Sequence, residues 1–204
     1  MQFLARIYAH NAYISFPITE KVRLLVMSKI WKSNFAMKLS CPAYESGEPD
    51  PFRTEIYKAQ HEQVRLQYRM KMIDDGWHII ESEMQIENGV FKGKIDDVFI
   101  GRDGIVAAVD YVSSLIPKMY KLKDAAISAG YLRHELKTDA SARVVSRGGV
   151  TEIPDELVEA TWRTVMSEGF LKILSLSDHE RLEYANPASD ICIYCANREC
   201  KYVQ

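Results

Sequence analysis

The chain has 204 residues, of which 47% are hydrophobic and 26% are charged, so it can bury the core of one domain. Its formal net charge of -2 excludes a chain-wide basic surface, and any nucleic-acid contact has to come from a local patch. The N-terminal residues lack the continuous apolar segment of a signal peptide, and no apolar stretch approaches the roughly 20 residues of a membrane helix. We therefore expect an intracellular, cytoplasmic protein with no membrane partner.

Two helices are predicted in the first third of the chain. Between residues 19 and 37, apolar side chains recur near helical spacing, and Pro42 should end this helix soon afterwards. A polar loop over residues 46–51 separates it from a long helix over residues 52–76, which carries His61 in its middle. A histidine on a partly apolar helix is typical of a hydrogen-bonded core residue as well as of a metal ligand.

Three strands are predicted next, over residues 77–87, 90–100 and 105–114. Asn-Gly at 88–89 and Gly-Arg-Asp-Gly at 101–104 separate them, and both segments are typical of hairpin turns. The middle of the sequence therefore predicts two successive hairpins.

Helices and a short sheet element fill the rest of the chain. A helix is predicted over residues 117–136, a strand or strand edge over 142–148, and one amphipathic helix over 154–174. The tail over residues 184–204 has little periodicity, so something other than its own core should hold it. This order of elements predicts an α/β or α+β domain around a small sheet.

Two aspartates interrupt apolar strand segments. Asp96 and Asp110 lie in successive strands, and neighbouring strands are about 4.8 Å apart, so carboxylates on one face could converge on one Mg²⁺ or Mn²⁺ ion. Because side chains alternate, Asp96 and Asp97 should point to opposite faces, with Ile95 and Asp97 on the face of Phe99. Alternation alone does not decide which aspartate faces the site, and the acids could also be ordinary polar residues at a strand edge.

Three of the four cysteines lie in the tail, as C-x2-C-x4-C. They are Cys192, Cys195 and Cys200, and Cys41 lies far upstream. In an intracellular protein, such thiols indicate a metal or cluster site rather than a set of disulfides. The tail supplies three ligands, so Cys41 can complete the set and attach the tail to the N-terminal helical region.

Several short motifs, in their order along the chain, resemble the RecB-like branch of the PD-(D/E)XK nucleases. They are "AQHEQ", "GKID", "VDY" and "AGYL". The resemblance implies a restriction-endonuclease-like core, a central mixed β-sheet flanked by helices. It also implies that His61, Asp96 and Asp110 bind the catalytic metal, together with the backbone carbonyl of Tyr111, and it favours Asp96 over Asp97.

The cysteines narrow this resemblance. One cysteine before the core, in "SCP", and three after it, in "CIYCANREC", are similar to the pattern of iron–sulfur RecB-like exonucleases. The short form resembles the CRISPR-associated exonucleases that make up the fourth Cas family. Four thiolates suit a [4Fe-4S] cluster, which we favour, a [2Fe-2S] cluster, or Zn²⁺, and the ligand type alone does not choose among them.

The resemblance also implies an organisation and a biological role. We expect one nuclease domain over residues 1–204, with an N-terminal helical part (1–50), a nuclease core (51–175) and an iron–sulfur tail (176–204). The implied substrate is single-stranded DNA or DNA ends, trimmed before integration into a CRISPR array, with the integrase proteins as partners. A virus- or plasmid-borne relative would have the same sequence features, and a homo-oligomer remains open.

The sequence departs from the family at one important position. The family's third motif reads acid-x-Lys, whereas here Val112 follows Asp110 and Tyr111, and valine cannot orient water or stabilise charge. Lys123 or Lys94 could replace the missing lysine. Lys118 is a third candidate, and all three could equally be surface lysines.

Where the family often has glutamine on the following helix, this chain has Ile127, four residues before Tyr131. Lys123 shares that helix face. A DNA path could be lined by Arg53, Lys58, Arg65, Arg133, Arg143 and Arg147.

Three hypotheses follow. The first is a metal-dependent deoxyribonuclease that uses a relocated lysine or cuts slowly without one, and we favour it because all three expected metal ligands are present. The second is a catalytically impaired nuclease fold that acts as a DNA-binding or assembly subunit. The third is a zinc-stabilised α/β domain of unknown role.

Overall fold

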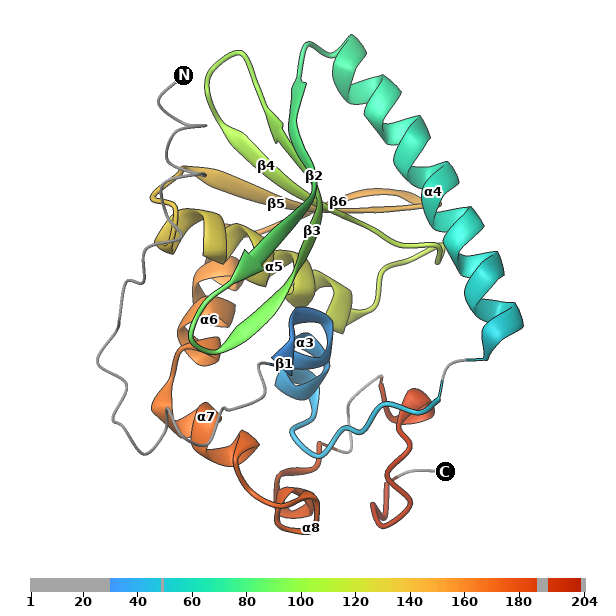
Figure 1. The fold of residues 1–204 in the computed structure, drawn as a ribbon, viewed down its shortest axis with the longest axis vertical. Helices are drawn as coiled ribbons and strands as arrows, with labels where there is room; N and C mark the ends of the chain where they lie inside the picture. Colours follow the sequence, from blue (N-terminus) through green and yellow to red (C-terminus); the bar gives the residue numbers. More distant parts are fainter. Residues whose placement is uncertain (1–29, 49, 187–190, 203–204) are drawn as a thin grey trace.

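The computed structural model describes residues 30–48, 50–186 and 191–202. These residues form a mixed α/β fold, in which helices flank a six-stranded mixed sheet (Figure 1). The α/β class expected from the sequence is therefore confirmed. Within the described ranges, no helix is long and apolar enough to cross a membrane.

The six strands pair in the order β1-β3-β4-β5-β6, with β2 also paired to β3. The β2–β3, β3–β4 and β5–β6 pairs are antiparallel, whereas β1 runs parallel to β3 and β4 parallel to β5. Both hairpins expected in the middle of the chain are present. In the first turn, the Asn88 side chain accepts hydrogen bonds from the N–H groups of Val90 and Phe91. The strands are β1 (Ile30–Trp31), β2 (His78–Glu87), β3 (Phe91–Ile100), β4 (Val106–Tyr111), β5 (Ala140–Ser146) and β6 (Gly149–Ile153).

The helices lie on both faces of this sheet. Helix α4 covers one face, and α5 and α6 pack on the other (Figure 1). The helices are α3 (Lys32–Ser40), α4 (Pro51–Asp74), α5 (Met119–His134), α6 (Asp155–Val165), α7 (Glu168–Leu174) and α8 (Asp178–Arg181), with short 3-10 turns at Leu182–Tyr184 and Cys192–Tyr194.

Three sequence-based expectations about these elements are corrected. The single helix expected over 154–174 is two helices, α6 and α7, because the Ser167 side chain accepts a hydrogen bond from the N–H of Phe170 and starts a new helix. Strand β6 was not expected. Of the helix expected over 19–37, residues 19–29 lie outside the described residues, and Ile30 and Trp31 form a strand rather than a helix.

Ile95 and Phe99 of β3 pack in different cores. The sequence placed the two side chains together on one face. Ile95 packs with Val98 in the core on the α5 side, whereas Phe99 packs with Tyr68 of α4. A shared strand face therefore does not bring these two side chains into one core.

The two edges of β3 are used differently. Strand β2 pairs along one edge from Lys92 to Ile100. The other edge pairs with β1 at Phe91 and Lys92 and with β4 from Asp97 onwards. Between these two partners, residues 93–96 form no ladder on that edge, and the candidate site lies at this gap.

Candidate active site and cysteine pocket

Asp96 lies where β3 and β4 separate. The ladder between the two strands ends at the Asp97–Val109 pair. Beyond it, the N–H of Tyr111 donates to the Asp96 carboxylate oxygen Oδ2 at 2.9 Å instead of to a strand carbonyl. The side chain of Asp96 therefore takes the place of the missing ladder bond and is held at the fork.

His61 of α4 contacts the same carboxylate. Its Nε2 lies 3.1 Å from Asp96 Oδ2, and both side chains are partly exposed. Burial by itself would raise the pKa of Asp96, but the hydrogen bonds from His61 and from the Tyr111 N–H outweigh it and hold the pKa below its usual value. Asp96 is therefore ionised at neutral pH and fixed by two donors.

Asp110 is buried, and its main partner is a residue that sequence reasoning missed. The Lys32 ammonium donates to both oxygens of Asp110, at 3.2 and 3.1 Å, from 78 positions earlier in the chain. Lys32 also donates to the Ser128 hydroxyl at 2.7 Å, which in turn donates to Asp110 at 3.1 Å. Only 4% of Lys32 and 6% of Asp110 are exposed, so this ion pair is closed off from solvent.

A third carboxylate, Asp124 of α5, faces the same ammonium. Its Oδ1 lies 3.5 Å from Lys32 Nζ, is buried, and has no hydrogen-bond partner among the described residues. We name Lys32, Asp110, Asp124 and Ser128 the Lys32 cluster. The other oxygen of Asp124, Oδ2, lies 4.0 Å from the Lys121 ammonium, so the carboxylate is ion-paired, while Oδ1 can still accept a hydrogen bond or contact a cation.

The charged side chains of the Lys32 cluster shift one another's pKa values. Burial raises the pKa of Asp110 to about 6; Lys32 opposes this rise, whereas Asp124 and Asp96 add to it. Burial alone would lower the pKa of Lys32, but Asp110, Asp124 and Asp96 outweigh it and hold the pKa above its usual value. Two carboxylates, Asp110 and Asp124, thus contact one ammonium, and Asp96 acts on it from farther away.

Strand β1 and Gly93 position Lys32. Residues 30 and 31 pair with the start of β3, so the chain enters α3 directly above Gly93. A Cβ at Gly93 would lie 2.5 Å from the Cβ of Lys32, closer than atoms can approach. The glycine of the "GKID" motif therefore leaves room for Lys32, and this motif was the signal in the sequence for a close neighbour at this point.

Asp97 points to the other face of the sheet and is fully buried there. It accepts hydrogen bonds from Arg65 at 3.1 Å, Arg69 at 2.5 Å and the Tyr111 hydroxyl at 2.8 Å. Burial would raise the pKa of Asp97, but the donors outweigh it and keep the pKa low. This buried ion network joins α4 to β3 and β4.

The lysines proposed from the sequence lie elsewhere. Lys123 donates to the Leu39 carbonyl at 3.0 Å and the Ser40 hydroxyl at 3.2 Å, at the C-terminal end of α3. Lys94 pairs with Glu83 on the exposed β2–β3 hairpin, and Lys118 is exposed just before α5. None of the contacts described for these three lysines is with Asp110, which pairs with Lys32 instead.

The positions around the missing motif lysine are apolar. Val112 is buried in the core on the α5 side and extends the sheet through its N–H, which donates to the Val145 carbonyl. Ile127 packs in the same core, and the Tyr131 hydroxyl donates to the Glu87 carbonyl at 3.3 Å.

Most of the basic residues expected along a DNA path have acidic partners. Arg65 binds Asp97, and Arg133 pairs with Asp155 and Glu159. Arg143 pairs with Glu152 and lies over the Trp77 ring. Arg53 and Lys58 form exposed pairs along the first turns of α4, and Arg147 is exposed in the turn between β5 and β6.

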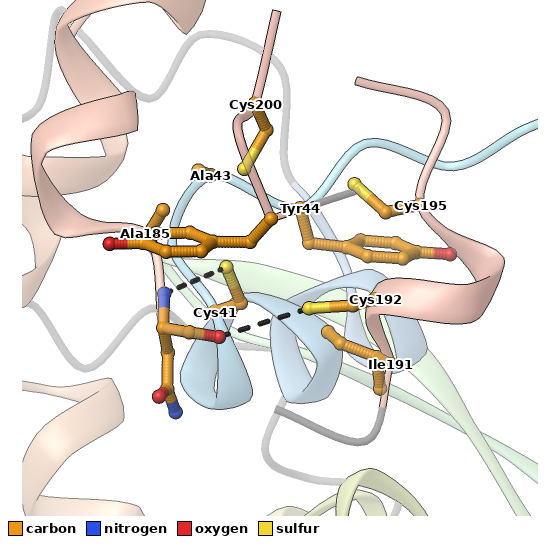
Figure 2. Close-up of a pocket in the computed structure, with 10 residues that line it drawn as sticks. Cys41, Ala43, Tyr44, Ala185, Ile191, Cys192, Cys195 and Cys200 are labelled. Carbon is orange, nitrogen blue, oxygen red and sulfur yellow. Dashed lines mark hydrogen bonds between the residues drawn. The ribbon is translucent and has the colours of Figure 1, made fainter. Parts of the chain in front are cut away.

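The four cysteines line one pocket (Figure 2). They are free thiols, and Cys41 is the most buried of them. The N–H of Asn186 donates to the Cys41 sulfur, and the Cys192 thiol donates to the Asn186 carbonyl. Residues from both ends of the sequence therefore meet at this pocket.

The tail is attached to the segment after α3. Ser46 and Cys195 form an antiparallel bridge, and the N–H of Ala196 donates to the Glu45 carbonyl at 2.9 Å. Ile191 packs against Cys41 and Tyr44. These contacts agree with the expectation that something outside its own core holds the tail.

Donor chemistry at both sites suits the expected metals, although neither site is preformed. Within residues 30–48, 50–186 and 191–202, no three His, Cys, Asp or Glu side chains already form a metal-binding group. Carboxylate oxygens, including the Asp124 oxygen that lacks a hydrogen bond among the described residues, suit a hard divalent cation, and four thiols around one pocket suit iron–sulfur or zinc.

Comparisons with known proteins add no further identification. No protein-family model matches the chain, and no curated protein matches it.

Proposed function

We propose that the chain is a metal-dependent deoxyribonuclease with a restriction-endonuclease-like core of the RecB type. The observation that supports this proposal is the convergence at the β3–β4 fork. Asp96 and Asp110 project from adjacent strands, His61 from α4 contacts Asp96, and Lys32 contacts Asp110. Carboxylates, a histidine and an ammonium are the groups that phosphodiester hydrolysis uses.

In this proposal Asp96 and Asp110 hold Mg²⁺ or Mn²⁺, with His61 and the Tyr111 carbonyl as further ligands. When bound, the cation supplies positive charge at the scissile phosphate and lowers the pKa of a coordinated water. The chain's own contribution is orientation. The Tyr111 N–H fixes the Asp96 carboxylate, and the Asp97 network on the other face fixes Tyr111.

The substrate in this proposal is single-stranded DNA or DNA ends, and the biological step is trimming before integration into a CRISPR array with integrase partners. The cysteine pocket holds an iron–sulfur cluster that attaches the tail to the segment around Cys41. The support for this part is the meeting of all four thiols at one pocket together with the motif order in the sequence.

A second function is supported by one observation. The Lys32 ammonium already neutralises one charge next to Asp110, so the site has a built-in cation. If that ammonium replaces the metal, the chain is a nuclease fold without catalysis that binds DNA or assembles with partners. A zinc-stabilised domain of another role is the third hypothesis, and the metal bound at the cysteines separates it from the first two.

A cleavage assay tests the proposal. Single- and double-stranded DNA, labelled at either end, is incubated with the wild type and Mn²⁺, Mg²⁺ or EDTA. Asp110→Asn and His61→Ala should each lower the rate by about 100-fold or more, because each removes a metal ligand. Glu55→Gln, an exposed change on α4, is the matched control and should leave the rate unchanged.

Two results separate the hypotheses. Cleavage that requires a divalent cation and is lost in Asp110→Asn supports the nuclease. Absence of cleavage with any divalent metal, together with DNA binding that Asp110→Ala leaves intact, contradicts it and favours the binding subunit.

A further inference from the structure

Lys32 is a buried lysine at the centre of the candidate site, where no motif in the sequence places one. We propose that Lys32 is a positioning residue of the nuclease reaction, supplying from the N-terminal side of the fold the ammonium that Val112 cannot supply from β4. This inference rests on the proposed function and names the residue that completes that site.

The contacts of Lys32 are those of a specific cation site. Lysine is rarely buried, because removing an ammonium from water is costly unless it is paired and hydrogen-bonded. Lys32 contacts both oxygens of Asp110 and the Ser128 hydroxyl, and it faces Asp124 at 3.5 Å. Three elements, α3, β4 and α5, thus converge on one ammonium.

The fold is arranged to bring Lys32 to this point. Strand β1 is only two residues long, yet it pairs with β3 and sets the start of α3 over Gly93. The Ser128 hydroxyl links Lys32 to Asp110 on the side of α5. The ammonium is therefore held by packing below it and by hydrogen bonds around it.

Val112 and Lys32 reach the same carboxylate from different directions. Position 112 follows Asp110 on the same strand face, and its valine is buried in the apolar core on the α5 side. Lys32 approaches across the gap in the edge of β3. An ammonium held there keeps the Asp110 carboxylate oriented towards the proposed cation, as a residue behind a metal ligand does.

The contacts favour an accessory cation over a metal substitute. Lys32 contacts Asp110 and faces Asp124 at 3.5 Å, whereas the Asp96 carboxylate contacts His61 and the Tyr111 N–H instead. The Asp124 oxygen that faces Lys32 has no hydrogen-bond partner among the described residues. Lys32 therefore leaves carboxylate oxygens at the fork that a divalent cation could bind.

The test compares Lys32→Met with the wild type in three measurements. These are the single-turnover rate on single-stranded DNA at saturating Mn²⁺, the DNA affinity in EDTA, and the Mn²⁺ affinity by calorimetry. We expect the rate to fall at least 100-fold while DNA affinity changes less than threefold and Mn²⁺ binding is retained. Lys94→Met, at an exposed lysine paired with Glu83, is the control and should change none of the three.

A rescue variant separates this role from a structural one. Val112→Lys in the Lys32→Met background returns an ammonium from the strand side. We expect this double variant to cleave at least tenfold faster than Lys32→Met alone. Lys32→Arg keeps the charge and should retain more activity than Lys32→Met. If Lys32→Met does not fold, the comparison is made in the Asp124→Asn background, which removes one of the two carboxylates that Lys32 contacts.

Three results would overturn the inference. Cleavage by Lys32→Met within threefold of the wild type contradicts it and leaves the proposed function standing. If Mn²⁺ binds only after Lys32 is removed, the ammonium occupies the place of the cation. That result contradicts both this inference and the proposed function. A folded wild type that cleaves no DNA contradicts the proposed function and this inference with it.

Discussion

Lys32 is the first residue of α3, and Cys41 follows its last residue, so one nine-residue helix joins the Asp110 site to the cysteine pocket. At a rise of 1.5 Å per residue, the backbones of the two residues are about 13 Å apart. The Cys41 N–H donates to Met37 and closes the last turn, and Phe35 and Ala36 are fully buried. A displacement at one end of this short, packed helix should therefore reach the other.

The first prediction concerns the glycine beneath Lys32. In Gly93→Ala the new Cβ would lie 2.5 Å from the Lys32 Cβ, so α3 has to move away from β3. We expect a loss of about 1–3 kcal/mol in the free energy of unfolding. Urea denaturation measures it. Gly89→Ala is the control, since no described atom beyond its chain neighbours lies within 4 Å of that Cβ, and an equal loss in both variants would contradict the packing argument.

The second prediction concerns Asp97. Asp97→Asn removes a fully buried charge and leaves Arg65 and Arg69 without their shared carboxylate. We expect about 3–5 kcal/mol of destabilisation, because breaking a buried ion pair leaves uncompensated charge. Thermal and urea unfolding check it against Glu152→Gln, an exposed partner of Arg143 that should cost at most about 0.5 kcal/mol. A similar small effect at Asp97 would show that the network does not stabilise the fold.

The third prediction separates Lys123 from Lys32. Lys123 donates to the carbonyl of Leu39 and to Ser40, which satisfies groups at the end of α3. Lys123→Met should cost about 1–3 kcal/mol in stability and leave the cleavage rate per folded molecule within threefold of the wild type. Unfolding and cleavage assays on one sample measure both, with exposed Lys71→Met as the control. A 100-fold loss of rate at full stability would instead place Lys123 in the reaction.

The fourth prediction concerns the cysteine pocket. The wild type purified without oxygen should contain iron and absorb light at about 400 nm, and Cys41→Ser should lose both. Tyr194→Phe, an exposed change between two of the tail cysteines, should keep them. Iron analysis and visible spectra decide the question. A colourless protein with one equivalent of zinc would establish the zinc alternative.

The fifth prediction is a pH dependence of stability between α5 and α6. Burial slightly favours the neutral form of Glu159, but hydrogen bonds from His134 and Arg133 outweigh this and hold its pKa below the ordinary value of 4.5. Because the folded-state pKa is the lower one, the stabilisation is present above pH 4.5 and is lost as the pH falls through the folded value. The difference in stability between wild type and Glu159→Gln should shrink over that range, and a constant difference would contradict the assignment.

Local signals in the sequence were sufficient for most of the elements. Helical spacing predicts α4 and α5, and the two hairpin turns predict how β2, β3 and β4 follow one another. The same spacing misses the break before α7, where a single serine cap begins a new helix within an unbroken apolar pattern. Strand β6 is also missed, because three of its five residues are exposed and its pattern is weak.

The sequence by itself determined the candidate groups: His61 on a helix, an aspartate in each of two adjacent strands, and four cysteines at the two ends of the fold. Only the tertiary structure decided which groups meet. Lys32 reaches Asp110 across 78 positions because a two-residue strand pairs with β3 above a glycine, and Arg65 and Arg69 of α4 pair with Asp97. Spacing along the chain reports neighbours within one element, whereas contacts between elements depend on how the sheet edges and helices pack.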